Sequence, residues 1–196
     1  MKHEKHEKHE KKGHHLDFLK KVWQLTTLQI SPEALPYTGR HLVLGIALNL
    51  LLSYLVAISL PVTELKSWLS PMLAIEMKSV NLFFLAFFLY LILKLTHKTN
   101  RFFKLFLAII MGTLMIESIN FMLSLIPSII KTDFFTMLFT LIIYITIAWM
   151  FVFIGHVFRF GLEVSRFKAI GIGIGYILIS GIVSMMIFGN PFEEIV

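Results

Sequence analysis

Five long apolar stretches separated by short polar connections dominate the pattern of the chain. They cover residues 42–62, 73–95, 103–126, 134–158 and 167–188. Each stretch is close to the ~20 residues that a helix needs to cross ~30 Å of hydrocarbon at about 1.5 Å per residue. Because the connections are short, neighbouring spans are expected to run antiparallel. The pattern predicts an all-α polytopic bundle of five transmembrane helices over residues 42–188.

Residues 16–37, which precede the first span, have a different pattern. Their apolar residues recur at roughly helical spacing: Leu16, Leu19, Trp23 and Ile30. Lys20 and Lys21 lie beside them, and Pro32 and Pro36 follow. This pattern predicts an amphipathic helix on the membrane surface, with Trp23 at headgroup depth. The prolines are expected to end it and to turn the chain into the bilayer.

Composition agrees with a membrane protein: 57% of the residues are hydrophobic and 15% are charged. The absence of cysteine excludes disulfides, thiol catalysis and cysteine-based metal centres. Residues 1–15 repeat Lys-His-Glu and are expected to be a disordered tail or an engineered tag. The tail histidines are a weak candidate for binding a transition metal: His3, His6, His9, His14 and His15.

The basic residues predict the orientation of the chain in the membrane. Of the 18 lysines and arginines, only Lys66, Lys78 and Lys131 fall on the side opposite the N-terminus. By the positive-inside rule the N-terminus is cytoplasmic and the C-terminus lies across the membrane, which we expect to be a bacterial inner membrane. Arg159, Lys20 and Lys21 are assigned to the membrane interface, and Lys78 is placed near the opposite one. Because the net charge of +6 flanks apolar spans, anionic headgroups are the expected partner rather than nucleic acid.

An acid stands in the middle of the third span, within a polar stripe of four residues. The stripe shares one helical face: Thr113, Glu117, Asn120 and Ser124. The fourth span has a second polar row, Thr136, Thr140 and Tyr144. Counting inward from the turn that joins these spans pairs Ser124 with Thr136, Asn120 with Thr140, and Glu117 with Tyr144. Two interpretations remain open: Glu117 handles protons or ions, or it fixes helix packing through hydrogen bonds.

The fifth span contains small residues at intervals of four: Gly171 with Gly175, and Ser180 with Ser184. This spacing lets helix backbones approach closely and makes homo-oligomerisation through the fifth span plausible. Asn49 in the first span is expected to hydrogen-bond another helix. His156 has no further ligands nearby, so it is a poor metal site. The chain lacks paired carboxylates and a nucleophile with its base, so we expect no enzymatic activity and no cofactor.

The arrangement of spans resembles the Ypt-interacting protein (YIP) family, in particular its small bacterial members. The stretches with the resemblance are "LTTLQISPEALPYTGRHLVLGIALNLLLSYL" and "AWMFVFIGHVFRFGLEVSRFKAIGIGIGYILISGIVSMMIF". The resemblance implies an integral helical protein that organises the membrane or recruits partners, without a known cofactor. The alternative hypothesis is a small transporter, channel subunit or proton-coupled carrier that uses Glu117, Asn120 and Tyr144.

Overall fold

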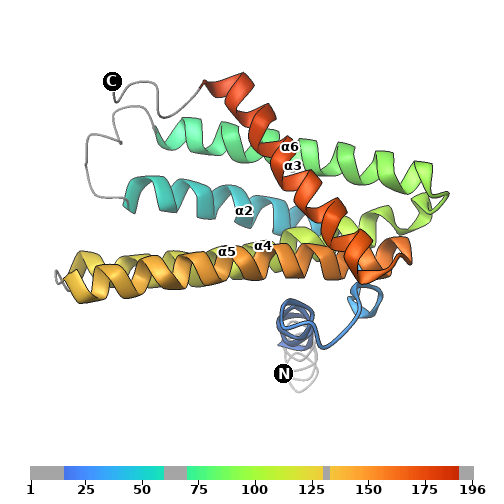
Figure 1. Ribbon diagram of the computed structural model, residues 1–196, viewed down its shortest axis with the longest axis horizontal. Coiled ribbons are helices and arrows are strands. Elements are labelled where there is room, and N and C mark those ends of the chain that lie inside the picture. Colours follow the sequence, from blue (N-terminus) through green and yellow to red (C-terminus); the bar gives the residue numbers. More distant parts are fainter. Residues whose placement is uncertain (1–15, 60–69, 130–132, 190–196) are drawn as a thin grey trace, which may run out of the picture.

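The computed structural model describes residues 16–59, 70–129 and 133–189 of the chain (Figure 1). Its long helices are α2 (Gly39–Ser59), α3 (Pro71–Leu95), α4 (Phe102–Ile129), α5 (Asp133–Leu162) and α6 (Arg166–Phe188). All five are long and apolar enough to cross a membrane. The prediction of an all-α bundle with five spans is therefore confirmed for the described residues.

The helices extend beyond several of the predicted spans. α2 begins three residues before the predicted start, and its predicted end at residue 62 lies outside the described residues. α4 continues past Pro127 to Ile129, and α5 continues through Arg159 to Leu162. Hydropathy finds the part of a helix that lies in hydrocarbon, whereas backbone hydrogen bonds continue into the polar residues beyond it. α3 begins with Pro71 in its first turn, and the Ser70 hydroxyl accepts a hydrogen bond from the Leu73 N–H at 3.1 Å.

α4 is the central helix of the bundle. Seven consecutive residues, from Leu105 to Met111, are at most 6% exposed. A single row of neighbours could cover only one face of a helix, so burial all round requires contacts on several sides. α2, α3 and α5 pack against α4, while α6 packs against α3 and α5 and runs obliquely across α3 in Figure 1. The polar stripe around Glu117 is therefore carried by the best-enclosed helix.

The outer surface of the bundle is covered by large apolar side chains. Phe83, Met137, Met186 and Phe167 are between 76% and 89% exposed. These residues come from α3, α5 and α6, so the apolar surface surrounds much of the bundle. A water-soluble protein rarely presents so much contiguous apolar surface, whereas lipid tails solvate it without cost. Together with the five long helices, this surface makes the chain an integral membrane protein.

An N-terminal helix, residues 16–26, lies against one side of the bundle, across the direction of α4 and α5 (Figure 1). Its predicted apolar residues Leu16, Leu19 and Trp23 are 47–68% exposed. The neighbouring face of the helix is formed by Phe18, Val22 and Leu25, which the spacing did not single out. These three side chains are at most 5% exposed and belong to the core. The helix thus has two apolar faces. One packs on the protein, and the other is left for lipid.

Three helices at one end of the bundle finish with a residue in the left-handed region. Leu28, His97 and Glu163 have φ angles of 62°, 57° and 56°. In each case the next N–H donates to the carbonyl five residues back, as in Gln29 to Gln24 at 2.8 Å and Lys98 to Leu93 at 2.8 Å. These are Schellman-type ends built without glycine, which costs roughly 1 kcal/mol per residue in backbone strain. Neighbouring contacts must hold these turns in place.

We call this region the basic end, because it carries the α3–α4 and α5–α6 connections and most of the described basic side chains. It lies to the right in Figure 1. The sequence analysis predicts that it is cytoplasmic. Positions nearer to the basic end are called inner below, and positions nearer to the other end are called outer.

Candidate functional site: an intramembrane ion pair between two cavities

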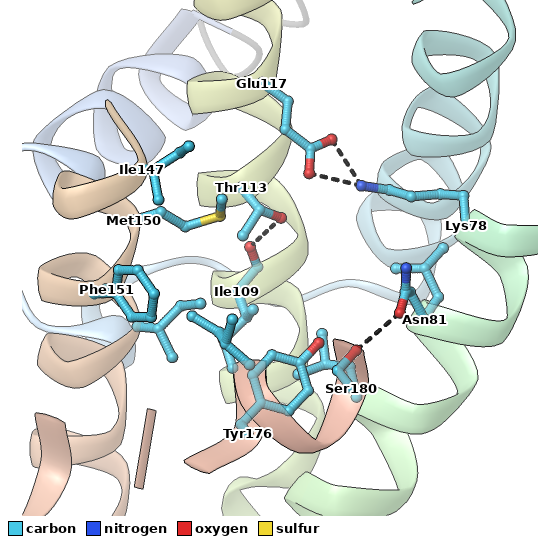
Figure 2. Close-up of a pocket in the computed structure, with 14 residues that line it drawn as sticks. Lys78, Asn81, Ile109, Thr113, Glu117, Ile147, Met150, Phe151, Tyr176 and Ser180 are labelled. Atoms are coloured by element: carbon cyan, nitrogen blue, oxygen red, sulfur yellow. Dashed lines mark hydrogen bonds and ion pairs between the residues drawn. The ribbon is translucent and has the colours of Figure 1, made fainter. Parts of the chain in front are cut away.

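Glu117 forms an ion pair with Lys78 inside the bundle. The Lys78 ammonium on α3 donates to both carboxylate oxygens of Glu117 on α4, each at 2.7 Å (Figure 2). The two side chains are only 17% and 33% exposed. An isolated ion in such surroundings is expensive, and a bidentate partner removes most of that cost. Glu117 therefore has a charged partner, Lys78, that the sequence pattern did not predict.

The side chain of Lys78, which was expected near the membrane interface, is directed into the bundle and reaches Glu117 on α4. α3 begins at Pro71, so Lys78 lies seven residues, or about 10 Å, along the helix. Its long flexible stem then spans the remaining distance to Glu117, which lies about 18 Å from the outer end of α4. The charge of this lysine suggested a position at the interface, and the ion pair shows that its side chain turns toward the neighbouring helix.

The predicted contact between Glu117 and Tyr144 is wrong. Tyr144 is 66% exposed and points away from the bundle, and Thr140 is also exposed. Ile143, the residue before Tyr144, lines a cavity together with Glu117, so the predicted position of Glu117 along the length of α5 was right. The rotation of α5 about its axis was wrong. The side chain of Thr136 lies outside the described part of the structure, so its pairing with Ser124 stays a prediction.

An inner cavity of about 200 Å³ lies beside the ion pair, between α3, α4, α5 and α6. Its polar lining is Lys78, Asn81, Thr113, Glu117, Tyr176 and Ser180. Figure 2 shows these groups around one space, with Ile147, Met150 and Phe151 of α5 on the opposite side. Thr113 donates to the Ile109 carbonyl of its own helix at 2.9 Å. The cavity therefore combines one charge pair, a few polar groups and an apolar wall.

An outer cavity of about 350 Å³ lies between α2, α4 and α5. Its polar lining is Ser53, Glu117, Asn120 and Ser124. The amide oxygen of Asn120 is buried and has no hydrogen-bond partner among the described residues. The Ser124 hydroxyl donates to the Phe121 carbonyl of its own helix at 2.7 Å. Glu117 is therefore a lining residue of both cavities.

Hydrogen bonds between α3 and α6 support the inner cavity. The Ser180 and Ser184 hydroxyls both donate to the amide oxygen of Asn81, at 2.8 and 3.2 Å. The spacing of small residues predicts helix packing through both serines, but it does not point to Asn81, Lys78 or Tyr176. A signal was available: Lys78 and Asn81 are three apart on α3, and Tyr176 and Ser180 are four apart on α6, so each pair shares a helical face. Asn49 similarly joins α2 to α4, because its amide donates to the Ile110 carbonyl at 3.0 Å.

The glycines that bring α5 and α6 together are not the predicted ones. A β-carbon at Gly171 or Gly175 would meet nothing within 4 Å. At Gly173 it would lie 3.5 Å from the Gly155 backbone nitrogen, and at Gly155 it would lie 3.2 Å from the Ile170 backbone. The close approach of these helices therefore uses Gly155 and Gly173. Gly171 and Gly175 lie open, and the predicted oligomer contact through them stays a prediction.

The N-terminal segment is attached to α5 by two side chains. The Trp149 indole N–H donates to the Thr26 carbonyl at 3.1 Å, and Nε2 of His156 lies 3.0 Å from the Ile30 carbonyl oxygen. His156 therefore has a structural contact here. Among the described residues, no three His, Asp or Glu side chains gather as metal ligands. The five tail histidines lie outside the described residues.

Ion pairs join the connections at the basic end. Arg101 contacts Glu163 at 2.6 Å and Glu33 at 3.3 Å, and Lys98 contacts Glu163 at 2.7 Å. Hydrogen bonds from Lys98 and Arg101 hold the pKa of Glu163 below its usual value. Of the residues predicted at the membrane interface, Lys20 is exposed, Lys21 pairs with Asp17 at 3.2 Å, and Arg159 lies over the Phe160 ring, and their place at an interface stays a prediction. Three segments far apart in sequence thus form one charged surface.

Comparisons of the chain with protein-family models, curated proteins and solved structures found no match. The resemblance to the YIP family accordingly stays a prediction from the sequence pattern. Function is inferred below from the geometry of the site.

Proposed function

We propose that the protein is a small membrane carrier that binds a proton and a polar solute at the Lys78–Glu117 pair. The observation that supports this proposal is that Glu117, paired with Lys78, lines both the inner and the outer cavity. The cavities follow one another along α4, from Ile109 and Thr113 in the inner one to Asn120 and Ser124 in the outer one. A group reached from both cavities can bind a solute from one and release it to the other.

The polar lining of the cavities favours this function over a purely structural ion pair. Ionisable residues within membrane spans commonly mark the paths of ions and substrates. A pair that only held helices together would be expected to pack tightly, without a neighbouring space of about 200 Å³. Asn120 also lines the outer cavity, and its amide oxygen is buried without a hydrogen-bond partner among the described residues.

A flux assay tests the carrier function. The purified protein is reconstituted into liposomes with a trapped pH-sensitive dye, and a pH gradient is imposed with organic acids, amino acids or sugars outside. We expect protein-dependent proton entry with at least one solute class, and its loss in Glu117→Gln. Glu76→Gln is the matched control, because Glu76 is exposed on α3 and lines neither cavity. Wild-type liposomes that behave like protein-free liposomes under every condition would contradict the proposal.

The second candidate function, a YIP-like protein that organises the membrane or recruits partners, is favoured by the basic end. There the ion pairs of Arg101 and Lys98 hold the α3–α4 and α5–α6 connections together. Lys104, Arg166 and Lys168 are exposed around them, which suits anionic headgroups. Energy transfer from a labelled protein to fluorescent anionic lipid should then exceed transfer to zwitterionic lipid. Replacing these three residues with glutamine should remove the difference, and equal transfer in the wild type would contradict this function.

A further inference from the structure

We propose that the inner cavity binds a small monocarboxylate anion together with one proton, the anion on Lys78 and the proton on Glu117. This inference rests on the proposed carrier function, and it names the class of solute. It follows from the charge balance of the ion pair and from the composition of the cavity wall.

The charge balance comes first. The Lys78 ammonium already donates to both oxygens of Glu117, so the pair is neutral and its strongest hydrogen bonds are used internally. An anion that entered alone would place two negative charges beside one positive charge, in surroundings where unbalanced charge is costly. Protonation of Glu117 removes one negative charge and releases Lys78 for the anion. The site is then neutral with and without its ligand.

Few other ionisable groups can alter this balance. Lys78 from α3 and Tyr176 from α6 are the other titratable side chains that line the inner cavity with Glu117. α2 contributes Ser53 to the lining of the outer cavity. α5 contributes Ile143 to the outer cavity and Ile147 to the inner cavity. None of these three side chains titrates. The proton that accompanies the anion is therefore assigned to Glu117.

The wall of the inner cavity suits a carboxylate with a short apolar tail. Asn81 accepts from two serines with its amide oxygen, so its remaining polar group is the amide nitrogen, a donor. In Figure 2 the hydroxyl of Tyr176 also lies on the cavity side, near Ser180. The other walls are apolar, with Leu82, Leu85 and Ile154 among them. At about 200 Å³ the cavity is smaller than the ~300 Å³ at which pockets for drug-sized ligands begin.

Other solute classes fit this site less well. A dicarboxylate or a phosphate would bring more than one negative charge against one ammonium and one proton. A cation would have to displace Lys78 from Glu117 and leave the ammonium unpaired. A neutral sugar would make no use of the charged pair, and the apolar walls would leave most of its hydroxyls unsatisfied.

Calorimetry can count the proton that the inference requires. Butyrate is titrated into the purified protein in detergent, in buffers of different ionisation enthalpy, over about one pH unit on either side of neutrality. We expect butyrate to bind with uptake of one proton, so that its Kd rises about tenfold per pH unit. Butyramide, which has the same shape without the charge, should not compete. Absent butyrate binding, or binding without proton uptake, would overturn the proposal.

Variants separate this site from a merely structural ion pair. Gln at position 117 imitates the protonated acid and leaves Lys78 available, so Glu117→Gln should bind butyrate without proton uptake and without pH dependence. Lys78→Met should not bind it, and the exposed Glu76→Gln should behave as the wild type. Should Lys78→Met fail to fold, the proton count in Glu117→Gln decides the matter alone. A Glu117→Gln protein that keeps the wild-type pH dependence would refute the proposal.

The calorimetry and the flux assay test the binding site and the carrier function separately. Butyrate binding with proton uptake, but without flux in liposomes, would support this binding site and contradict the carrier function. Protein-dependent flux of another solute without butyrate binding would support the carrier and refute the monocarboxylate.

Discussion

At the scale of single residues, the Lys78–Glu117 pair is the contact on which the interior of the bundle depends most. Each partner is buried enough that its charge would be costly alone, and each is the only described ion-pair partner of the other. Removing one partner of a fully buried pair typically costs 3–5 kcal/mol, because the other charge stays in place. Here Glu117 is one-third exposed, so a smaller cost is expected.

We predict that Lys78→Met lowers the free energy of unfolding by roughly 2 kcal/mol, since it strands the Glu117 carboxylate. Glu117→Gln should cost less, because the flexible lysine can extend toward the outer end of α3. The double variant Lys78→Met/Glu117→Gln should be more stable than Lys78→Met. Equilibrium unfolding in mixed micelles of all four proteins gives the coupling energy, and a value indistinguishable from zero would contradict a stabilising contact.

The residues around this pair also show what spacing along a sequence can establish. The stripe from Thr113 to Ser124 was found because a helix repeats every 3.6 residues, and Glu117 indeed faces the interior. The contact predicted on α5 was wrong, because counting from a turn fixes the depth of a residue on that helix but not the rotation of the helix, and the observed partner, Lys78, lies on α3 instead. The rotation depends on packing such as Phe153 against Gly112. The residue of α5 that lines a cavity together with Glu117 is Ile143, one position before the predicted neighbour, Tyr144.

At the scale of helices, glycines distinguish the interfaces that need close contact from the surfaces that do not. A β-carbon on Gly112 of α4 would lie 2.0 Å from the ring of Phe153 on α5, which is fully buried. A β-carbon on Gly171 of α6 would meet nothing within 4 Å. Gly112 therefore lies in an α4–α5 interface that leaves no space for a β-carbon, whereas the space beside Gly171 is open.

We therefore predict that Gly112→Ala destabilises the protein by about 1–3 kcal/mol through overpacking of a buried ring. Gly171→Ala is the matched control, and it should be neutral or slightly stabilising because alanine favours helix. Unfolding in mixed micelles measures both. Equal effects of the two substitutions would show that α4 and α5 do not pack as described.

Helices themselves were easier to predict than their contacts. All five spans were located to within four residues at each described end, since burial in hydrocarbon demands long uninterrupted apolar runs. The N-terminal helix was predicted with one apolar face, and the structure has two. The buried face of this helix, formed by Phe18, Val22 and Leu25, was overlooked, because an apolar face that contacts lipid and one that packs on protein have the same sequence pattern. Only the fold shows which of the two faces packs on the bundle.

At the scale of the whole molecule, Glu163 joins segments from distant parts of the chain and makes them sensitive to pH. Lys98 and Arg101 hold its pKa below the usual 4.5, so its ionised form stabilises the folded protein. That stabilisation is present above the ordinary pKa and is lost as the pH falls through the lowered one. Because the carboxylate is exposed, the effect should be small and weakened by salt.

We predict that the unfolding midpoint of the wild type falls more steeply than that of Glu163→Gln as the pH drops from about 6 to about 3. At neutral pH the variant should be slightly less stable, and in acid the two should converge. Glu76→Gln provides the control, because Glu76 has none of these partners among the described residues. Parallel pH profiles for the wild type and Glu163→Gln would refute the role of this carboxylate.

The direction in which the bundle crosses the membrane is the last property of the whole molecule that the charges predict. Among the described residues, most of the lysines and arginines lie at the basic end, so the positive-inside rule predicts that this end is cytoplasmic. The chain has no cysteine, so a single introduced thiol reports its own side without background. Thr99→Cys, exposed at the basic end, should be protected from a membrane-impermeant maleimide in intact cells and labelled after permeabilisation. Ser70→Cys, exposed at the other end, should be labelled in both states, and the reverse pattern would place the outer cavity on the cytoplasmic side of the membrane.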